Sequence, residues 1–214
     1  MNLNNYIDHT LLKATATADD IKRICEEAKE NKFCAVCINP CYVKLAKNML
    51  NDTDIKVCTV IGFPLGQNTT ETKVFEAKNA VENGADEIDM VINVGAVLSG
   101  NYDCVSKEIA SLREITHGKI VKVIIETCYL NCEQIKKMTQ ICIENNADFV
   151  KTSTGLGTRG ASLQDIETIA EVAHNAIKIK ASGGIKTKEF AAQLINAGAQ
   201  RIGTSSGVAL VSKE

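Results

Sequence analysis

Two lysines lie where an α/β barrel enzyme would hold a reactive amine. Lys151 ends the apolar run that begins at Phe149, Lys180 ends the run that begins at Ile177, and Gly and hydroxyl residues follow each run. Such runs are typical of the carboxyl end of a buried strand, where the catalytic groups of these barrels lie. Burial and a neighbouring ammonium both favour a neutral lysine, which can attack a carbonyl. The pair therefore predicts Schiff-base chemistry.

Strand alternation predicts that the two lysines face the same interior. Lys151 shares its parity with Ser153, and Lys180 shares its parity with Ser182. Parallel neighbours lie about 4.8 Å apart, so two long side chains on adjacent strands can bring their nitrogens close enough for strong coupling. The alternative is that each lysine extends its aliphatic stem to solvent from a strand end.

A carboxylate fits the same interior. Asp89 lies within the apolar run from Glu87 to Asn93, where an unpaired carboxylate would be costly. Facing inward near the lysines, it could carry protons through a water, as carbinolamine formation and carbon–carbon cleavage require. The alternative is a carboxylate satisfied by backbone donors at a strand end. Lys122 and Glu126 share one parity in a later run and form a second candidate interior pair.

Glycine and hydroxyl residues after the last two runs indicate an anion site. A Gly-Gly pair follows the seventh run, and the segment 203–207 ends the eighth and opens a helix. In barrels these loops often bind phosphate through backbone N–H groups and a helix N-terminus. We therefore expect a phosphorylated small-molecule substrate. The candidate binding residues are Gly183, Gly184, Lys186, Ser205 and Ser206.

Short β-rich runs alternate with longer amphipathic segments, which indicates serial βα units and a parallel sheet. The predicted strands are Ile7 to Leu12, Ala35 to Asn39, Lys56 to Gly62, Glu87 to Asn93, Ile120 to Thr127, Phe149 to Ser153, Ile177 to Ser182 and Arg201 to Thr204. Helical segments include Thr17 to Asn31, Thr70 to Asn83, Asn131 to Asn145 and Ser162 to Asn175. Eight strands are the number that closes a TIM (β/α)8 barrel.

The length of 214 residues suits one core, and no linker or charge block interrupts the pattern, so residues 1–214 are predicted to form a single barrel domain. The alternative is an open doubly wound sheet, because a strand count does not prove closure. A dinucleotide-binding fold is disfavoured, since no Gly-x-Gly-x-x-Gly follows the first strand.

Composition restricts the partners. A net charge of −2 and 4% aromatic residues argue against a nucleic-acid surface. No stretch approaches the roughly 18 apolar residues of a membrane span, and the segment from Met1 to Asn5 does not resemble a signal sequence. We therefore expect a cytosolic protein without nucleic-acid or membrane partners.

Nine cysteines are interpreted as reduced thiols used as small hydrophobes. Cys34 and Cys37 are three residues apart on one strand and point to opposite faces, so they are poorly placed to share a metal. No metal site and no cofactor is predicted. Cys37, near a strand end, could line a pocket.

At this point the chain resembles the deoxyribose-phosphate aldolases, a family of class I aldolases. The likeness covers nearly the whole chain, and its two lysine segments are its most specific part. It is carried by Asp8 to Leu12, Val121 to Thr127, Phe149 to Gly155, Lys180 to Ile185 and Gly203 to Gly207.

The resemblance implies a barrel that reversibly cleaves 2-deoxy-D-ribose 5-phosphate to D-glyceraldehyde 3-phosphate and acetaldehyde without metal. By position, Lys151 is similar to the Schiff-base nucleophile, Lys180 to the second lysine that lowers its pKa, and Asp89 to the proton-relay carboxylate. Positions that match the pocket lining are Asp8, Thr10 and Cys37, and those that match the phosphate site are Gly155, Gly183, Gly184, Ser205 and Ser206.

The chain departs from its relatives in two places. Some relatives have a lysine where this chain has Leu156, so Lys186 and backbone donors are expected to meet the phosphate charge. Many end in a terminal tyrosine that assists proton transfer, whereas this chain ends at Lys213-Glu214. Alternative functions are a phosphosugar isomerase or epimerase with Asp89 as base, and a non-catalytic phosphosugar-binding barrel. A homo-oligomer, with a dimer favoured, is expected.

Overall fold

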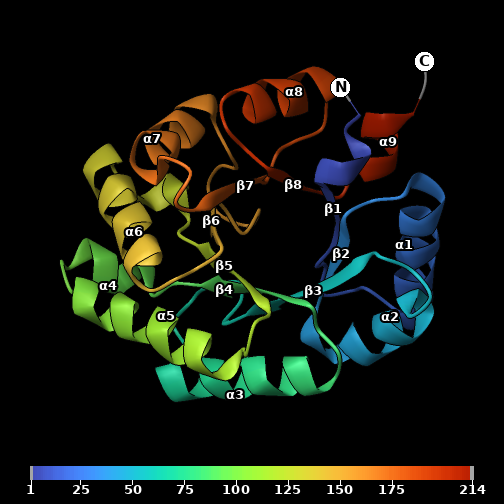
Figure 1. Ribbon diagram of the computed structural model, residues 1–214, viewed down its shortest axis with the longest axis horizontal. Coiled ribbons are helices and arrows are strands. Elements are labelled where there is room, and N and C mark those ends of the chain that lie inside the picture. The colour runs from blue at the N-terminus through green and yellow to red at the C-terminus, as the bar shows by residue number, and fades with distance from the viewer. Residues whose placement is uncertain (1, 213–214) are drawn as a thin grey trace.

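The computed structural model describes residues 2–212, and its strands close into a barrel inside a ring of helices (Figure 1). All eight strands are parallel and pair in chain order, and β1 pairs with β8. That last pairing confirms the predicted barrel and excludes the open sheet. The strands are β1 (Ile7–Leu11), β2 (Ala35–Ile38), β3 (Lys56–Ile61), β4 (Glu87–Val91), β5 (Ile120–Ile124), β6 (Phe149–Lys151), β7 (Lys178–Ser182) and β8 (Arg201–Thr204).

Each predicted strand is present, and most of the differences lie at the carboxyl ends. The fifth strand ends at Ile124 and not at Thr127, because Glu126 adopts the left-handed conformation with φ of 52°. The sixth ends at Lys151, two residues before the predicted Ser153. These ends are where side chains and loops turn toward the site.

The helices begin at the polar residues that the sequence offers as caps. Thr17 and Asn131 each form a capping box, with Asp20 and Gln134 respectively, and so satisfy backbone donors at the starts of α1 and α6. The helices are α1 (Ala18–Asn31), α2 (Val43–Leu50), α3 (Thr70–Glu82), α4 (Val94–Leu98), α5 (Tyr102–Ile115), α6 (Cys132–Glu144), α7 (Leu163–Ala173), α8 (Lys188–Asn196) and α9 (Gly207–Val211), with short 3-10 turns η1 (Asn4–Tyr6), η2 (Pro40–Tyr42) and η3 (Thr127–Tyr129). Within residues 2–212, none of them is long and apolar enough to cross a bilayer.

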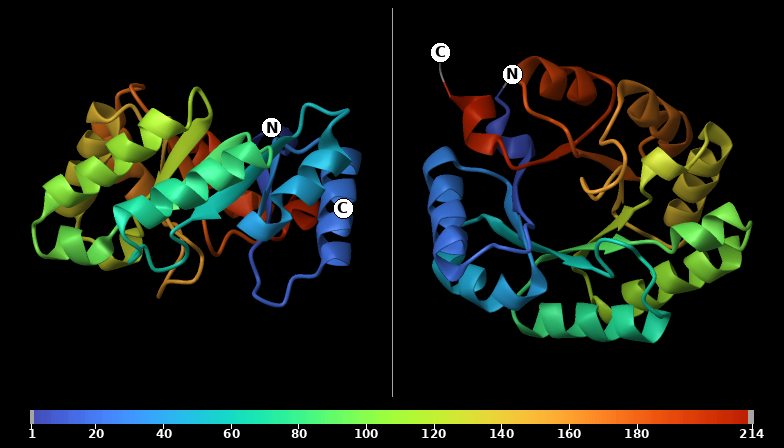
Figure 2. Two further views of the ribbon diagram at one scale, coloured as in Figure 1. Left: turned by 90° about the horizontal axis from the view of Figure 1, so that it is seen from below. Right: turned by 180° about the vertical axis from the view of Figure 1, so that it is seen from behind.

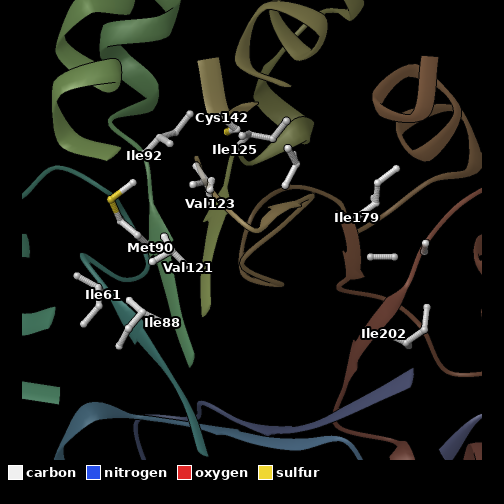
Figure 3. Close-up of a cluster of buried hydrophobic side chains, with 14 of the residues drawn as sticks. Ile61, Ile88, Met90, Ile92, Val121, Val123, Ile125, Cys142, Ile179 and Ile202 are labelled. Atoms are coloured by element: carbon white, nitrogen blue, oxygen red, sulfur yellow. The ribbon is translucent and has the colours of Figure 1, made fainter. Parts of the chain in front are cut away.

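Alternation along the strands separates an apolar shell from a charged interior. Ile88, Met90, Val121 and Val123 belong to the apolar cluster shown in Figure 3, which packs between the strands and the helices. The residues that alternate with them, such as Asp89, face the barrel axis. One face of each strand therefore packs in the apolar core under the helices, and the other face places polar and charged side chains in the barrel interior.

The loops after the strands gather at one end of the barrel. In the side view of Figure 2, the loops that follow β1 and β6 project from the same end. In parallel βα units this is the carboxyl end of the strands, where sites on such barrels are built.

Candidate active site

A cavity of about 300 Å³ opens at the carboxyl end of the barrel. Of the side chains and backbones predicted to form a site, eight line it: Thr10, Lys151, Gly155, Gly183, Gly184, Lys186, Ser205 and Ser206. The other four, Asp8, Cys37, Asp89 and Lys180, are fully buried beneath it and do not form its wall. A larger hollow of about 490 Å³ lies near Cys34 at the opposite end of the strands, away from both lysines.

Lys151 and Lys180 meet at one carboxylate oxygen. Their Cα atoms are direct partners on β6 and β7. Both Nζ atoms donate to Oδ2 of Asp89 at 2.7 Å, so the two nitrogens are at most twice that distance apart. Lys151 is 2% exposed and borders the cavity, whereas Lys180 is 0% exposed and lies below it. Both lysines therefore face the barrel interior, as their strand parity predicts, and neither extends to solvent.

The packing around Lys180 leaves room for nothing larger than glycine at position 203 of β8. A Cβ placed on Gly203 would lie 3.1 Å from Cε of Lys180 and 2.9 Å from Cβ of Ser182. Lys180 also donates to Asp8, whose other oxygen accepts from Arg201 Nε at 2.6 Å. These contacts hold the ammonium of Lys180 in one place.

The electrostatics keep these partners ionised. Burial raises the pKa of Asp89, but the cations of Lys122, Lys151 and Lys180 outweigh it and hold that pKa well below its usual range. Burial likewise lowers the pKa of Lys180, and the carboxylates of Asp8 and Asp89 overcome it and raise that pKa above its usual value. Lys180 is therefore a permanent cation beside Lys151.

Two thiols complete the interior. Cys37 and Cys58 are direct partners on β2 and β3, and Cys58 Sγ donates to Asp89 Oδ1 at 3.1 Å. The hydrogen bond with Cys58 lowers the pKa of Cys37 to about 7, against burial, which raises it. Donor atoms of Cys37, Cys58 and Asp89 lie within 4.8 Å of one another, as metal ligands would. Three ammonium groups already occupy the oxygens of Asp89, so this donor set suits cations of the protein better than a metal ion.

The other end of the cavity suits an anion. Gly183 and Gly184 have positive φ, 85° and 75°, and present a turn of backbone to the cavity. Lys186 is exposed at its rim, and so is Lys13, a cation that the sequence reasoning missed. Leu156, 66% exposed, occupies the position where some relatives have a lysine.

Glu126 has a different partner from the one expected. It lies beyond the end of β5, is 3% exposed, and accepts from the backbone N of Thr154 at 3.2 Å and from its Oγ1. Lys122 instead lies inside the barrel and donates to Asp89 Oδ1 at 2.7 Å. The predicted pairing of Lys122 with Glu126 is therefore wrong, because the left-handed turn at Glu126 ends the alternation. Glu126 fixes the loop that carries Gly155 and Leu156.

Comparisons with known proteins agree with this geometry. Residues 3–213 match the model of the DeoC/LacD family aldolase. A deoxyribose-phosphate aldolase of Caldanaerobacter subterraneus is 55% identical over 216 residues, covering 100% of this chain and 94% of the relative. Among solved structures, an aldolase called QR15 superposes with a TM-score of 0.94 at 46% identity, covering 98% of this chain and 94% of that one. The tetrameric deoxyribose phosphate aldolase of Aeropyrum pernix gives 0.91 at 34% identity, covering 98% and 89%.

Proposed function

The chain belongs to the DeoC/LacD family of aldolases, and from that membership we propose that it cleaves 2-deoxy-D-ribose 5-phosphate reversibly to D-glyceraldehyde 3-phosphate and acetaldehyde. It is a carbon–carbon lyase. The observation that supports this most strongly is a buried lysine at the floor of the cavity, Lys151, with a carboxylate and a second ammonium directly beneath it.

Lys151 is the proposed nucleophile. Among residues 2–212, three lysines line the cavity, and Lys13 and Lys186 are exposed to solvent, where an ammonium is well hydrated. Lys151 is buried, borders the cavity, and shares a carboxylate oxygen of Asp89 with the fixed cation of Lys180. Asp89, hydrogen bonded to both, is placed to guide the proton that Lys151 gives up to a water while remaining a carboxylate.

The reaction then follows from the imine. The neutral amine of Lys151 adds to the C1 carbonyl of the open-chain sugar to give a carbinolamine, which takes up one proton and loses water to become a protonated imine. When the C3 hydroxyl loses its proton, the C2–C3 electron pair moves toward the imine nitrogen, so that glyceraldehyde 3-phosphate leaves and an enamine remains. Protonation at C2 and hydrolysis release acetaldehyde and restore the lysine. We propose that Asp89 moves these protons through a water.

The phosphate is proposed to bind at the far end of the cavity. Backbone donors of Gly183, Gly184 and Ser205, the hydroxyl of Ser206 and the cation of Lys186 surround that end. Gly155, Thr10 and Lys13 border the same space. With Leu156 in place of a cation, the two exposed lysines supply the positive charge. Asp8 and Cys37 act from below, through Lys180 and Cys58.

Borohydride trapping tests the proposal. Reduction in the presence of deoxyribose 5-phosphate is expected to leave a covalent adduct on the peptide that contains Lys151, and Lys151→Ala should give neither adduct nor turnover. Lys178→Met, which removes an exposed lysine from β7, is the matched control and should behave as the parent. Turnover without an adduct would indicate an isomerase, and binding without turnover a silent phosphosugar-binding barrel.

Three further properties are part of this proposal. We propose that residues 1–214 act as one domain, because all eight strands close into one barrel. A cytosolic location fits the nine free cysteines, which a reducing compartment maintains. A homo-oligomer, with a dimer favoured, fits Phe75, which is 70% exposed on α3. Sedimentation velocity tests the last point, and a monomer at all concentrations would contradict it.

A further inference from the structure

Six charged side chains beneath the cavity form a closed ring in which cations and anions alternate. Arg201 bridges two carboxylates, since it donates to Asp8 at 2.6 Å and to Glu87 at 2.9 Å. Lys180 connects Asp8 to Asp89, and Lys122 connects Asp89 to Glu87 at 2.7 Å and 2.5 Å. Every member is buried.

The six charges of the ring sum to zero, and Lys151 adds one positive charge to the cluster. The ring's three cations match its three carboxylates, and Lys151 is a fourth cation that contacts Asp89 alone among the carboxylates of residues 2–212. On the amino side, Phe149 is 3% exposed and its ring centre lies 6.0 Å from Lys122 Nζ and 5.9 Å from Arg201. Phe149 therefore keeps water on the amino side of the barrel from solvating an excess positive charge in the cluster.

We propose that Glu87 and Arg201 are positioning residues of the aldolase, which close this ring so that the proton shed by the buried cluster comes from Lys151 and not from Lys122 or Lys180. The proposal rests on the proposed function, because it concerns how the nucleophile becomes neutral. Neither residue touches the cavity, so both act through the ring.

The reason is the number of carboxylates at each amine. Lys122 and Lys180 each contact two carboxylates within 2.7 Å. If either lysine loses its proton, two buried carboxylates each lose one neighbouring positive charge. Lys151 contacts one, and when it loses its proton each carboxylate of the ring still contacts its two ring cations. The titratable and charged groups that surround Lys151, by strand, are Asp8 on β1, Cys37 on β2, Cys58 on β3, Glu87 and Asp89 on β4, Lys122 on β5, Lys180 on β7 and Arg201 on β8.

Opposite substitutions in the remote pair test this arrangement. Glu87→Gln removes an anion, so Lys151 should shed its proton more easily and the acid limb of the imine-trapping rate should move to lower pH. Arg201→Gln removes a cation and should move that limb to higher pH. Each displacement should be about one pH unit, the effect of one charge about 10 Å away at an effective dielectric constant of about 20.

Two further variants separate charge from structure. Arg201→Lys keeps the cation and should keep the parent profile, and the double variant Glu87→Gln/Arg201→Gln restores the balance and should bring the limb back toward the parent. A merely structural role predicts loss of rate without opposite shifts. Single variants that trap normally on Lys151 but shift the limb in the same direction, or not at all, would overturn the proposal, whereas absence of any adduct on Lys151 in the parent would overturn the proposed function instead.

A measurement on the native enzyme keeps the test independent of variant folding. Nitrogen-15 NMR of the lysine side chains, followed as pH rises, distinguishes the neutral amine from ammonium. Lys151 should be the first of the three buried barrel lysines to become neutral. Earlier loss of the proton from Lys122 or Lys180 would overturn the proposal.

Discussion

Replacing Lys180 by methionine should shift the pH at which the imine forms by about two units. Methionine keeps most of the apolar stem and removes the charge. The Nζ atoms of Lys180 and Lys151 are at most twice 2.7 Å apart, because both bind the same oxygen of Asp89. Two unit charges at that separation repel by about 3 kcal/mol at an effective dielectric constant of about 20. Since about 1.4 kcal/mol corresponds to one pH unit, the acid limb of the imine-trapping rate of the variant should lie about two pH units higher.

The assay is the rate of borohydride trapping with deoxyribose 5-phosphate, measured from about pH 6 to pH 10. At neutral pH the Lys180→Met variant should trap about 100-fold more slowly than the parent, and the rates should converge at the alkaline end. The matched control is Lys178→Met, which removes an exposed charge from the same strand and should leave the profile unchanged.

The shape of the profile decides the outcome. A uniform loss of rate at every pH, with no displacement of the acid limb, would show that Lys180 holds geometry only. A variant that matches the parent throughout would show that its ammonium has no influence on Lys151. Either result would refute the electrostatic reasoning.

Three other predictions concern the cavity mouth, the glycine turn and acid stability. Leu156→Lys should lower the KM for deoxyribose 5-phosphate about three- to tenfold and leave that for deoxyribose unchanged, and equal changes would contradict a phosphate contact. Gly183 has φ of 85°, and in Gly183→Ala the new Cβ would lie 2.9 Å from the Cα of Gly160, so chemical denaturation should show that the free energy of unfolding falls by about 2–3 kcal/mol. The control is Gly118→Ala, where φ is 77° and the space around the new Cβ is open, and there the loss should be about 1 kcal/mol. Asp8 and Asp89 have pKa values held below the usual 3.8, so their stabilisation is complete above that value and is lost as pH falls below it. The free energy of unfolding should therefore begin to drop near pH 4 and approach a slope of about 3 kcal/mol per pH unit below about pH 3, and a slope of less than one proton in urea titrations there would contradict this.

Local patterns in the sequence were sufficient to predict the eight strands, four of the helices and the inward faces of Lys151, Lys180 and Asp89. A period of two along Phe149 to Lys151 and along Lys178 to Ser182 orients both lysines inward, because no other arrangement keeps Val150 and Ile179 in the core. The cavity residues of the last two loops were predictable for a similar reason, since Gly183 and Ser205 follow strands whose ends are marked by composition. The number of strands does not by itself predict that β1 pairs with β8, because eight strands can also form an open sheet. The structure shows that the sheet curves until these two strands pair.

The partners of each charge could not be predicted in the same way. Asp89 and Lys122 are Cα partners, but Glu87 reaches Arg201 across the barrel axis, and no local rule relates positions on β4 and β8. Strand parity predicts whether a side chain faces inward. It does not predict how deep along the barrel axis the side chain lies, because that depends on how far successive strands are staggered around the closed barrel. Glu126 shows the same limit, because one left-handed residue removed it from the interior that parity had assigned to it. The chemistry of Lys151 thus depends on contacts between strands that are distant in the chain, and these contacts exist only once the barrel has closed.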